Sequence, residues 1–410
     1  MTKKIWSALG LSSALFLTGC SDLGFQIQQL VSPAAREYVI PGEYEPVHSV
    51  IVSEHLATFR NGQDFMKALI DTDVDVWFLA SNAPQVRQTG QILRQRFGLN
   101  LEQIRQVKPM PVLTETVWAR DWAPVMAKHA TEPGKWGLLD FFYYPDRPVD
   151  DASPQQVHSV LNQSPDYLNL PQGLSFSHFS VPVEIEGGNI MCNEAHCFVT
   201  EEVLWRIEER GETADPEAIV NQLEKHIRQE FWLVPRMPFE GTGHIDIWAK
   251  FLNNNQVIIG EISEESLTAI PEEQADTYRA VKTFLDEQAT GKDIAGNVVP
   301  NALATVLQQE APEVEILRIP MPTPGVYRGI ETFRTYTNSL FVNDTVIVPR
   351  YIRGSRAERR NRDLLREQEA KVRAVYEQAG YRVKWILADN LIRDGGAWHC
   401  VSMQVPQLTP

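Results

Sequence analysis

Four side chains of this sequence have the types needed to act together on one small cation. Cys400 supplies a thiol, His244 an imidazole, and Asp121 and Asp246 two carboxylates. Carboxylates hold a planar guanidinium through paired, charge-assisted hydrogen bonds. A thiolate could then attack the central carbon and form a covalent adduct, while an imidazole protonates the departing ammonia and later activates water. The set therefore predicts hydrolysis of a guanidinium group.

His244 and Asp246 are separated by one residue and follow Gly243. Residues 245–251 are expected to form a strand, and side chains two apart in a strand point to the same face. The pair would then share one pocket, and Gly243 would let the backbone turn tightly into the strand. The alternative is an edge strand whose His and Asp face solvent.

Aromatic residues surround Asp121. Trp118 and Trp122 flank it in the sequence and could wall a site of low dielectric, or stack on a cation. The alternative for this motif is a salt bridge between Arg120 and Asp121 under aromatic cover.

Cys400 follows a glycine pair closely. Gly395 and Gly396 would permit the backbone to approach a ligand. The alternative is that Cys400 is a small buried apolar residue, the commoner fate of cysteine. The conjunction of these segments, rather than any one of them, favours a nucleophile.

The remaining cysteines have other expected roles. Cys192 and Cys197 flank a short polar segment between two apolar runs, so a hairpin with a cross-strand disulfide is expected outside the cytoplasm. A zinc site that uses His196 is the alternative, but the sequence offers no second ligand pair at suitable spacing.

The N-terminus has the features of a targeting segment. Lys3 and Lys4 precede an apolar run over residues 5–17, which is short for a membrane-spanning helix. The run ends in Leu-Thr-Gly-Cys at residues 17–20, which resembles the lipobox of bacterial lipoproteins. This resemblance implies a signal peptide over residues 1–19 and lipidation of Cys20, which would place the protein in the cell envelope, anchored to a membrane by acyl chains. An ordinary cleaved signal peptide is the alternative.

Composition limits the classes of protein to consider. Residues 20–45 are expected to form the lipidated N-terminus and a tether, and residues 46–410 one catalytic domain. A hydrophobic fraction of 43% suffices for a packed core. The formal net charge of −15 argues against nucleic-acid binding and weakly favours cationic ligands, although acidity also serves solubility.

Short apolar strands alternate with amphipathic helical stretches, which predicts an α/β or α+β fold. Strands are expected at residues 49–52, 74–79, 136–144, 189–200, 245–251, 256–260, 314–319, 339–348 and 382–387. Helices are expected at residues 83–97, 215–231, 276–287 and 356–379.

Together these stretches resemble the guanidine-modifying enzymes of the pentein superfamily, in the family of agmatine deiminases and bacterial peptidylarginine deiminases. The matching segments occur in the family's order at residues 118–124, 186–189, 243–251, 335–341 and 395–400. The resemblance implies an α/β fold of five ββαβ units around a pseudo-fivefold axis, with the site at its centre.

The resemblance also implies roles. Cys400 would be the nucleophile and His244 the general acid and then base, while Asp121 and Asp246 hold the guanidinium. Glu186 would support the histidine or the pocket floor. Asn338 and Trp118 would line the site. Trp398, which departs from the family's pattern beside the cysteine, is expected to reshape the substrate entrance.

The resemblance leaves several substrates open. The main expectation is an exported, lipid-anchored deiminase that converts arginine in peptides to citrulline and ammonia through a thiouronium intermediate on Cys400, with no metal and no cofactor. Arg147 resembles part of the loop with which the family's peptidylarginine deiminases bind a substrate carboxylate, but a surface salt bridge is the interpretation favoured for this residue. The other readings are a deiminase of agmatine or another small guanidine, a guanidinium-binding lipoprotein without catalysis, and a cysteine peptidase, which would leave Asp121 without a role.

Overall fold

The computed structural model describes residues 36–81, 86–268, 270, 272–322, 325–327, 330–351 and 362–410. The expected signal peptide and Cys20 lie outside the described residues. Among the helices that are described, none combines the length and the apolar character needed to cross a membrane.

Within the described residues, five sheets repeat one pattern, in which an antiparallel pair of strands is extended by a parallel neighbour. This is the strand arrangement of a ββαβ unit. The sheets are β19(Met403–Pro406)-β2(Val47–Ser53)-β3(Asp75–Leu79)-β4(Val107–Met110), β1(Tyr38–Val39)-β5(Val125–His129)-β6(Lys135–Phe142)-β7(Ser175–Glu184), β8(Met191–Cys192)-β9(His196–Thr200)-β10(Glu230–Val234), β11(Ala249–Asn253)-β12(Gln256–Glu261)-β13(Glu315–Pro320) and β16(Leu340–Val342)-β17(Thr345–Arg350)-β18(Arg382–Leu387). A further pair joins β14(Gly325–Tyr327) and β15(Ile330–Thr332).

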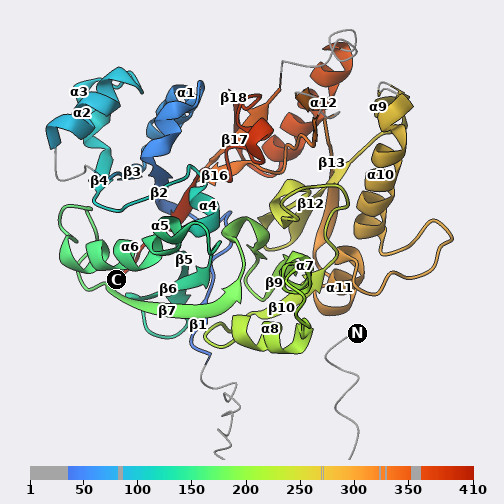
Figure 1. The fold of residues 1–410 in the computed structure, drawn as a ribbon, viewed down its shortest axis with the longest axis horizontal. Helices are drawn as coiled ribbons and strands as arrows, with labels where there is room; N and C mark the ends of the chain where they lie inside the picture. The colour runs from blue at the N-terminus through green and yellow to red at the C-terminus, as the bar shows by residue number, and fades with distance from the viewer. Residues whose placement is uncertain are drawn as a thin grey trace, which may run out of the picture.

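Figure 1 shows these sheets following one another around the molecule, with most of the longer helices toward the outside. The α-helices are α1(Gly62–Ile70), α2(Val86–Gln95), α3(Leu101–Arg105), α4(Ala119–Trp122), α5(Pro148–Asp151), α6(Ser153–Gln163), α7(Glu202–Glu209), α8(Pro216–Leu223), α9(Glu264–Thr268), α10(Ala275–Thr290), α11(Leu303–Glu310) and α12(Arg362–Gln378). Short 3₁₀ helices are η3(Glu54–Thr58), η4(Gly187–Asn189), η5(Ile245–Ile247), η6(Glu272–Gln274) and η7(Ile392–Asp394).

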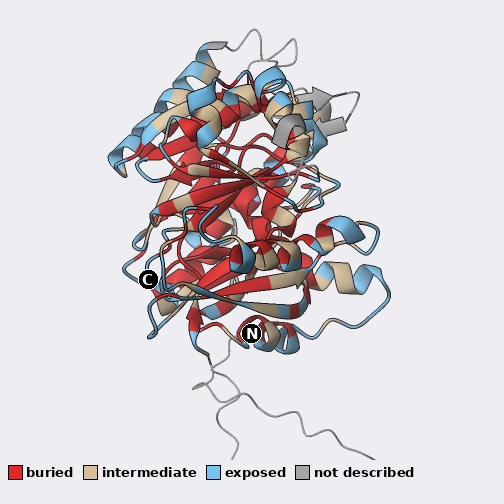
Figure 2. Ribbon diagram, turned by 90° about the vertical axis from the view of Figure 1, so that its left-hand side faces the viewer, coloured by how far each residue is buried: buried red, intermediate tan, exposed pale blue. Residues whose placement is uncertain are grey.

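The core lies between the sheets and the outer helices. Figure 2 shows the strands largely buried and the outward faces of the helices exposed. Val50, Ile51 and Val52 are successive residues of β2 and all are fully buried, so both faces of this strand are covered. Such continuous apolar runs are typical of strands that are packed on two sides. The buried strands give the loops at their ends a rigid support.

Most of the predicted elements are present, but several boundaries differ. The strands expected at residues 256–260 and 382–387 match β12 and β18 closely. The strand expected at 339–348 is a hairpin, because Asn343 adopts a positive φ of 54° between β16 and β17. The helix expected at 215–231 ends already at Leu223. The last two residues of the expected range, 230 and 231, instead begin β10.

The expected tether is partly inside the domain. Residues 36–45 lie on the domain side of the boundary, because Tyr38 pairs with His129 of β5 and both Tyr38 and Ile40 are buried. Glu43 forms ion pairs with Arg120 and Lys250. Apolar burial and these ion pairs hold the segment against the fold, so any tether is shorter than the sequence suggested.

Candidate active site

Residues from distant parts of the chain form the candidate site. Asp121 belongs to α4, Glu186 caps η4, His244 caps η5, and Asn338 and Cys400 precede β16 and β19. All are buried or nearly so. One backbone contact joins two of these segments directly, since the N–H of Arg120 donates to the carbonyl of Cys400 at 3.0 Å. The segment that carries Asp121 and the segment that carries the thiol are therefore fixed to each other.

The predicted strand at residues 245–251 was wrong in its first half. His244 is extended, with φ −76° and ψ 145°, and caps η5, a 3₁₀ turn that contains Asp246, while β11 starts only at Ala249. The side-chain oxygen of Asn189 accepts from the N–H of Ile245 at 3.3 Å and stabilises this turn. His244 and Asp246 do reach one pocket, but through a cap and a tight turn rather than through strand alternation.

Gly188 lies in the middle of the site. A methyl group on its α-carbon would lie 2.7 Å from Nδ1 of His244, 3.0 Å from Oδ1 of Asp121 and 3.1 Å from Oδ2 of Asp246. Three polar side chains therefore converge on one small volume, and any side chain at residue 188 would crowd it. The sequence analysis noted this glycine within the 186–189 segment but gave it no role.

The environment of Cys400 favours the thiol over the thiolate. Its Sγ lies 3.1 Å from Nδ2 of Asn338 and 3.7 Å from Oδ2 of Asp246. Burial, with the negative charges of Asp246 and Asp121, raises the pKa of Cys400 well above its ordinary value. A cation placed between the two carboxylates would oppose both charges and thereby favour the thiolate.

His244 has the opposite bias. Burial lowers its pKa, but the contact of Nε2 with Glu186 and the charges of Asp121 and Asp246 outweigh this effect and raise the pKa to about 10. Arg206 donates to Glu186 at 2.7 Å and helps to keep that carboxylate ionised. The imidazole is therefore held in its protonated form, ready to act as an acid.

Three buried polar atoms of the site have no hydrogen-bond partner among the described residues. They are Oδ1 of Asp121, Nδ1 of His244 and Oδ1 of Asp246. Buried polar atoms are rarely left unpaired, and such exceptions often mark places where a ligand binds. The two carboxylate oxygens are acceptors, and a guanidinium carries five N–H donors in one plane. The site is thus suited to a planar cation.

Of the other predicted site residues, Trp118 lies beside the sulfur of Cys400 and Arg147 lies further out. Trp118 and Cys400 both press on Gly396, where an added methyl group would lie 2.7 Å from Cζ3 of Trp118 and 2.8 Å from Sγ. Trp118 therefore lies beside the sulfur. Arg147 lies further out, donates to the hydroxyl of Tyr143 at 3.0 Å and stacks over Tyr144. Within the described residues it forms no ion pair with a carboxylate.

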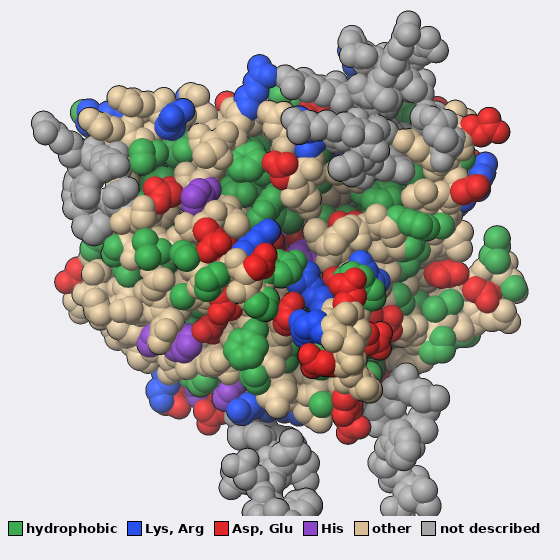
Figure 3. Space-filling model, viewed as in Figure 1, with side chains coloured by type: hydrophobic (Ala, Val, Ile, Leu, Met, Phe, Trp, Pro, Cys, Tyr) green, Lys and Arg blue, Asp and Glu red, His purple; other side chains and the backbone are tan. Residues whose placement is uncertain are grey.

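Tyr143 links Arg147 to the site. Burial raises the pKa of Tyr143, and the charges of Asp121 and Glu186 raise it further. Arg147 also stacks over Tyr144, whose hydroxyl accepts from Arg206, the partner of Glu186. Figure 3 shows basic and acidic side chains gathered over α7, beside the middle of this face. Arg147 is thus a bordering residue rather than a member of the central group.

Trp398 does not reshape the entrance as expected. Its ring is fully buried, stacks on Phe65 at 4.6 Å and donates its indole N–H to the carbonyl of Ile386 at 2.9 Å. These contacts turn it into the core, away from the sulfur of Cys400.

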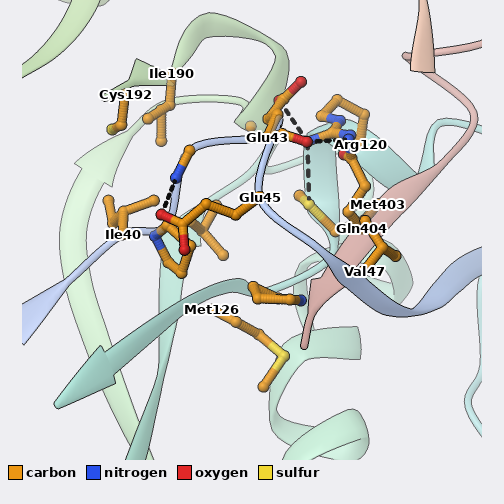
Figure 4. Close-up of a pocket in the computed structure, with 15 residues that line it drawn as sticks. Ile40, Glu43, Glu45, Val47, Arg120, Met126, Ile190, Cys192, Met403 and Gln404 are labelled. Carbon is orange, nitrogen blue, oxygen red and sulfur yellow. Dashed lines mark hydrogen bonds and ion pairs between the residues drawn. The ribbon is translucent and has the colours of Figure 1, made fainter. Parts of the chain in front are cut away.

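Sequence reasoning missed the residues behind Asp246. Nδ1 of His399 lies 2.6 Å from Oδ2 of Asp246, and Nε2 of His399 lies 2.7 Å from Glu43. Glu43 in turn contacts Lys250 and Arg120. Figure 4 shows Glu43 and Arg120 side by side at the edge of a pocket that Gln404 and Met403 also line. His399 precedes the cysteine directly, which was the available signal, but its partner Glu43 lies 356 residues earlier.

The other two described cysteines are bonded to each other. Cys192 and Cys197 are partners in the β8–β9 hairpin and are joined by a disulfide. Their sulfurs cannot then act as thiolate ligands beside His196. Among the described residues, no group of three or more His, Cys, Asp or Glu side chains is arranged to hold a metal ion.

Comparisons with known proteins identify the family and similar chains. The family model of the Porphyromonas-type peptidyl-arginine deiminase matches residues 60–406. A protein of Enterococcus faecalis named "Putative agmatine deiminase" is 24% identical over 395 residues, which cover 92% of this chain and 98% of that one.

Solved structures show the same fold. An agmatine deiminase of Enterococcus faecalis superposes with a TM-score of 0.62 at 18% identity, over 91% of this chain and 97% of that one. The agmatine deiminase of C. jejuni gives a TM-score of 0.61 at 15% identity, over 91% and 97%. The fold is therefore the α/β pentein fold.

Proposed function

Because the chain belongs to the Porphyromonas-type peptidyl-arginine deiminase family, we propose that Cys400 is the nucleophile that deiminates a guanidinium bound between Asp121 and Asp246. The enzyme class, a hydrolase of carbon–nitrogen bonds in guanidines, follows from the family. The observation that carries the assignment of residues is the convergence of unpaired polar atoms from Asp121, His244 and Asp246 around Gly188, with the thiol beside them.

Each group has a defined step in this proposal. The bound cation offsets the carboxylate charges that keep Cys400 protonated, the thiol releases its proton to solvent, and the thiolate attacks the guanidinium carbon. The imidazolium of His244 gives its proton to one amino group, which leaves as ammonia and creates a thiouronium on the sulfur. Neutral His244 then takes a proton from water, whose oxygen adds to the same carbon, and loss of the sulfur leaves a ureido product.

Two substrates have support. Relatives named as agmatine deiminases favour a small guanidine such as agmatine. A specific feature favours arginine at the end of a peptide: Arg147 borders the site with no carboxylate partner among the described residues, and a substrate carboxylate would fill that role. The same charge would repel the second cation of agmatine. The relatives named agmatine deiminases therefore favour agmatine, whereas the charge of Arg147 favours arginine.

A substrate panel tests the function. Wild-type protein and Cys400→Ala are incubated with agmatine, free arginine and an arginine-ended peptide, and the ureido product and ammonia are measured. We expect product from at least one substrate with the wild type and none with Cys400→Ala. Binding of these guanidines without turnover by the wild type would contradict the proposal and favour a binding protein.

Arg147→Gln tests the choice of substrate. If arginine carboxylates bind here, the variant should raise KM for the arginine-ended peptide by about 10-fold, as expected for loss of a charge-assisted hydrogen bond, and should leave or lower KM for agmatine. Equal KM values for the peptide in both proteins would remove Arg147 from substrate recognition and leave agmatine as the better candidate.

We also propose that the protein is exported and anchored by lipid at Cys20. The lipobox-like segment at residues 17–20 supports this, and so does the disulfide between Cys192 and Cys197, since structural disulfides are rare in the cytoplasm. Labelling with a fatty-acid analogue, followed by membrane fractionation, should show lipid on the wild type and none on Cys20→Ala. Unlabelled wild type would rule the anchor out.

A further inference from the structure

We propose that His399 is a positioning residue that holds Asp246 turned toward the guanidinium, and that Glu43 fixes the ring of His399 from behind. This inference rests on the proposed function, because the orientation of Asp246 matters only if its carboxylate binds a guanidinium. It assigns a role to buried charged groups that the mechanism above leaves unused.

The two oxygens of Asp246 have different surroundings. Oδ2 accepts from Nδ2 of Asn338 at 2.8 Å, lies 2.6 Å from Nδ1 of His399 and is 3.7 Å from the sulfur of Cys400. Oδ1 is buried and has no partner among the described residues. A carboxylate that is held by one oxygen keeps the other directed at the ligand. His399 provides the shortest of the contacts at Oδ2, so its ring has the closest control of this orientation.

The ring of His399 is itself fixed on both sides. It is 1% exposed, and its second nitrogen, Nε2, lies 2.7 and 2.9 Å from the two oxygens of Glu43. Nδ1 faces Asp246 and Nε2 faces Glu43, so the ring of His399 cannot rotate without losing at least one of these contacts. The direction of Asp246 is therefore set by groups on the side away from the substrate.

Glu43 is suited to be a fixed point. It contacts Nζ of Lys250 at 2.5 Å and Nη1 of Arg120 at 2.9 Å. Desolvation raises the pKa of Glu43, but Arg120, His399 and Lys250 outweigh this effect and hold it well below its usual value. A continuous row of polar contacts runs from Asp246 through His399 to Glu43 and on to Lys250 and Arg120, and each contact holds the next in place.

The rear side of this row borders two small pockets. One is lined by Glu43, Arg120 and Gln404 among others, and the other by Glu43, His399 and Asp246. Glu43 keeps 22% of its side chain exposed, whereas His399 is buried. The row of contacts thus runs from these two pockets to the carboxylate of Asp246. Its far end, Glu43, can be substituted without changing a residue that binds the substrate.

Two substitutions of His399 separate positioning from simple packing. Asparagine places its amide nitrogen near the position of Nδ1, and glutamine near that of Nε2. His399→Asn therefore keeps a donor for Asp246 and loses Glu43, while His399→Gln keeps Glu43 and loses Asp246. If His399 acts through Asp246, His399→Asn should stay within about 3-fold of wild-type KM, and His399→Gln should raise KM by about 10- to 100-fold with a smaller change in kcat.

Binding provides a readout that does not need turnover. The same substitutions in a Cys400→Ser background are titrated with agmatine and with glycyl-arginine, and we expect the affinity of the asparagine variant to exceed that of the glutamine variant by the same 10-fold or more. Equal losses in both variants, or no loss in either, would overturn the inference. A wild-type protein that turns over none of the panel would defeat the proposed function alone, since the binding titration still tests His399.

His178 offers a matched control. Its Nε2 lies 2.7 Å from Oδ2 of Asp140 on the neighbouring strand β6, outside the candidate site. His178→Asn and His178→Gln should both retain wild-type KM. If His399→Gln does not fold, Glu43→Gln replaces it, since it leaves the ring of His399 in place, although it also removes the charge that pairs with Lys250 and Arg120. We then expect KM to rise about 5-fold, and an unchanged KM would overturn the inference.

Discussion

His244 and Cys400 are both buried and both held in their protonated forms, but only the protonated form of His244 is the reactive one. Glu186, with Asp121 and Asp246, raises the pKa of His244 to about 10, and burial, with Asp246 and Asp121, raises the pKa of Cys400. For the imidazole this produces the acid that a leaving ammonia needs, whereas for the sulfur it produces the unreactive thiol. A bound cationic substrate opposes the carboxylate charges and so favours the thiolate of Cys400. Without such a substrate the sulfur stays a thiol, which protects it from reaction with other electrophiles.

The raised pKa of His244 predicts a dependence of stability on pH. A group whose pKa is higher in the folded than in the unfolded state stabilises the fold fully below its unfolded pKa, about 6.5, and loses that contribution as the pH rises toward about 10. His244→Gln keeps a donor for Glu186 but does not titrate. We therefore expect the free energy of unfolding of the wild type to fall relative to this variant between pH 6.5 and 10, as measured by urea denaturation.

The comparison at each pH removes the effect of other titrating groups, which are common to both proteins. A difference between the wild type and His244→Gln that stays constant over this range would show that His244 is not held in its charged form.

At the scale of the element, short 3₁₀ turns rather than strands present the reactive groups. η4 and η5 place Gly188 and Asp246 against each other, and the side chain of Asn189 accepts from both Thr200 and Ile245, which links the two turns to β9. Strand alternation was a poor guide here because the sequence shows a polar pair before an apolar run, and this pattern fits a cap followed by a strand as well as a strand alone.

Gly188→Ala tests the role of η4. The added methyl group would lie among Asp121, His244 and Asp246, so we expect kcat/KM to fall by about 100-fold, the effect of displacing reacting groups by about 1 Å. Overpacking of this kind costs about 1–3 kcal/mol, which should leave the protein folded. Activity is measured with the substrate that the panel identifies, and folding by circular dichroism.

Gly241→Ala is the matched control, since nothing lies within 4 Å of a methyl group at that residue. It should retain wild-type kcat/KM. Full activity in Gly188→Ala would show that the volume beside Gly188 does not hold the guanidinium.

At the scale of the whole molecule, the sequence predicted the fold class, and the side chains that it singled out converge in the structure, but it did not predict the groups that support them. The motifs around Asp121, His244 and Cys400 were recognisable because each combines a reactive residue with glycine or tryptophan over a few positions. Glu43 carried no such signal, because its partners His399, Lys250 and Arg120 are near it only after folding. Long-range ion pairs of this kind depend on topology, which local patterns do not encode.

The pairing of β19 with β2 predicts that the last strand is essential. Met403, Val405 and Leu408 are buried, and burial of three such side chains contributes roughly 5 kcal/mol, which is comparable to the whole stability of many domains. Deletion of residues 403–410 should therefore yield insoluble or unfolded protein, even though no expected catalytic residue is removed. Size-exclusion chromatography and thermal melts measure this.

Deletion of the exposed residues Thr409 and Pro410 alone is the control and should leave folding intact. A soluble, cooperatively melting protein without residues 403–410 would show that the first sheet is stable without β19.

The contact between β19 and β2 also bears on when this protein can first become reactive. If the chain emerges from its N-terminus, β2 is present early but its antiparallel neighbour is among the last segments to appear, directly after the thiol. A nascent chain then has the carboxylates and the imidazole without Cys400. Guanidine-bearing molecules would meet an inert polypeptide until this strand has paired with β2.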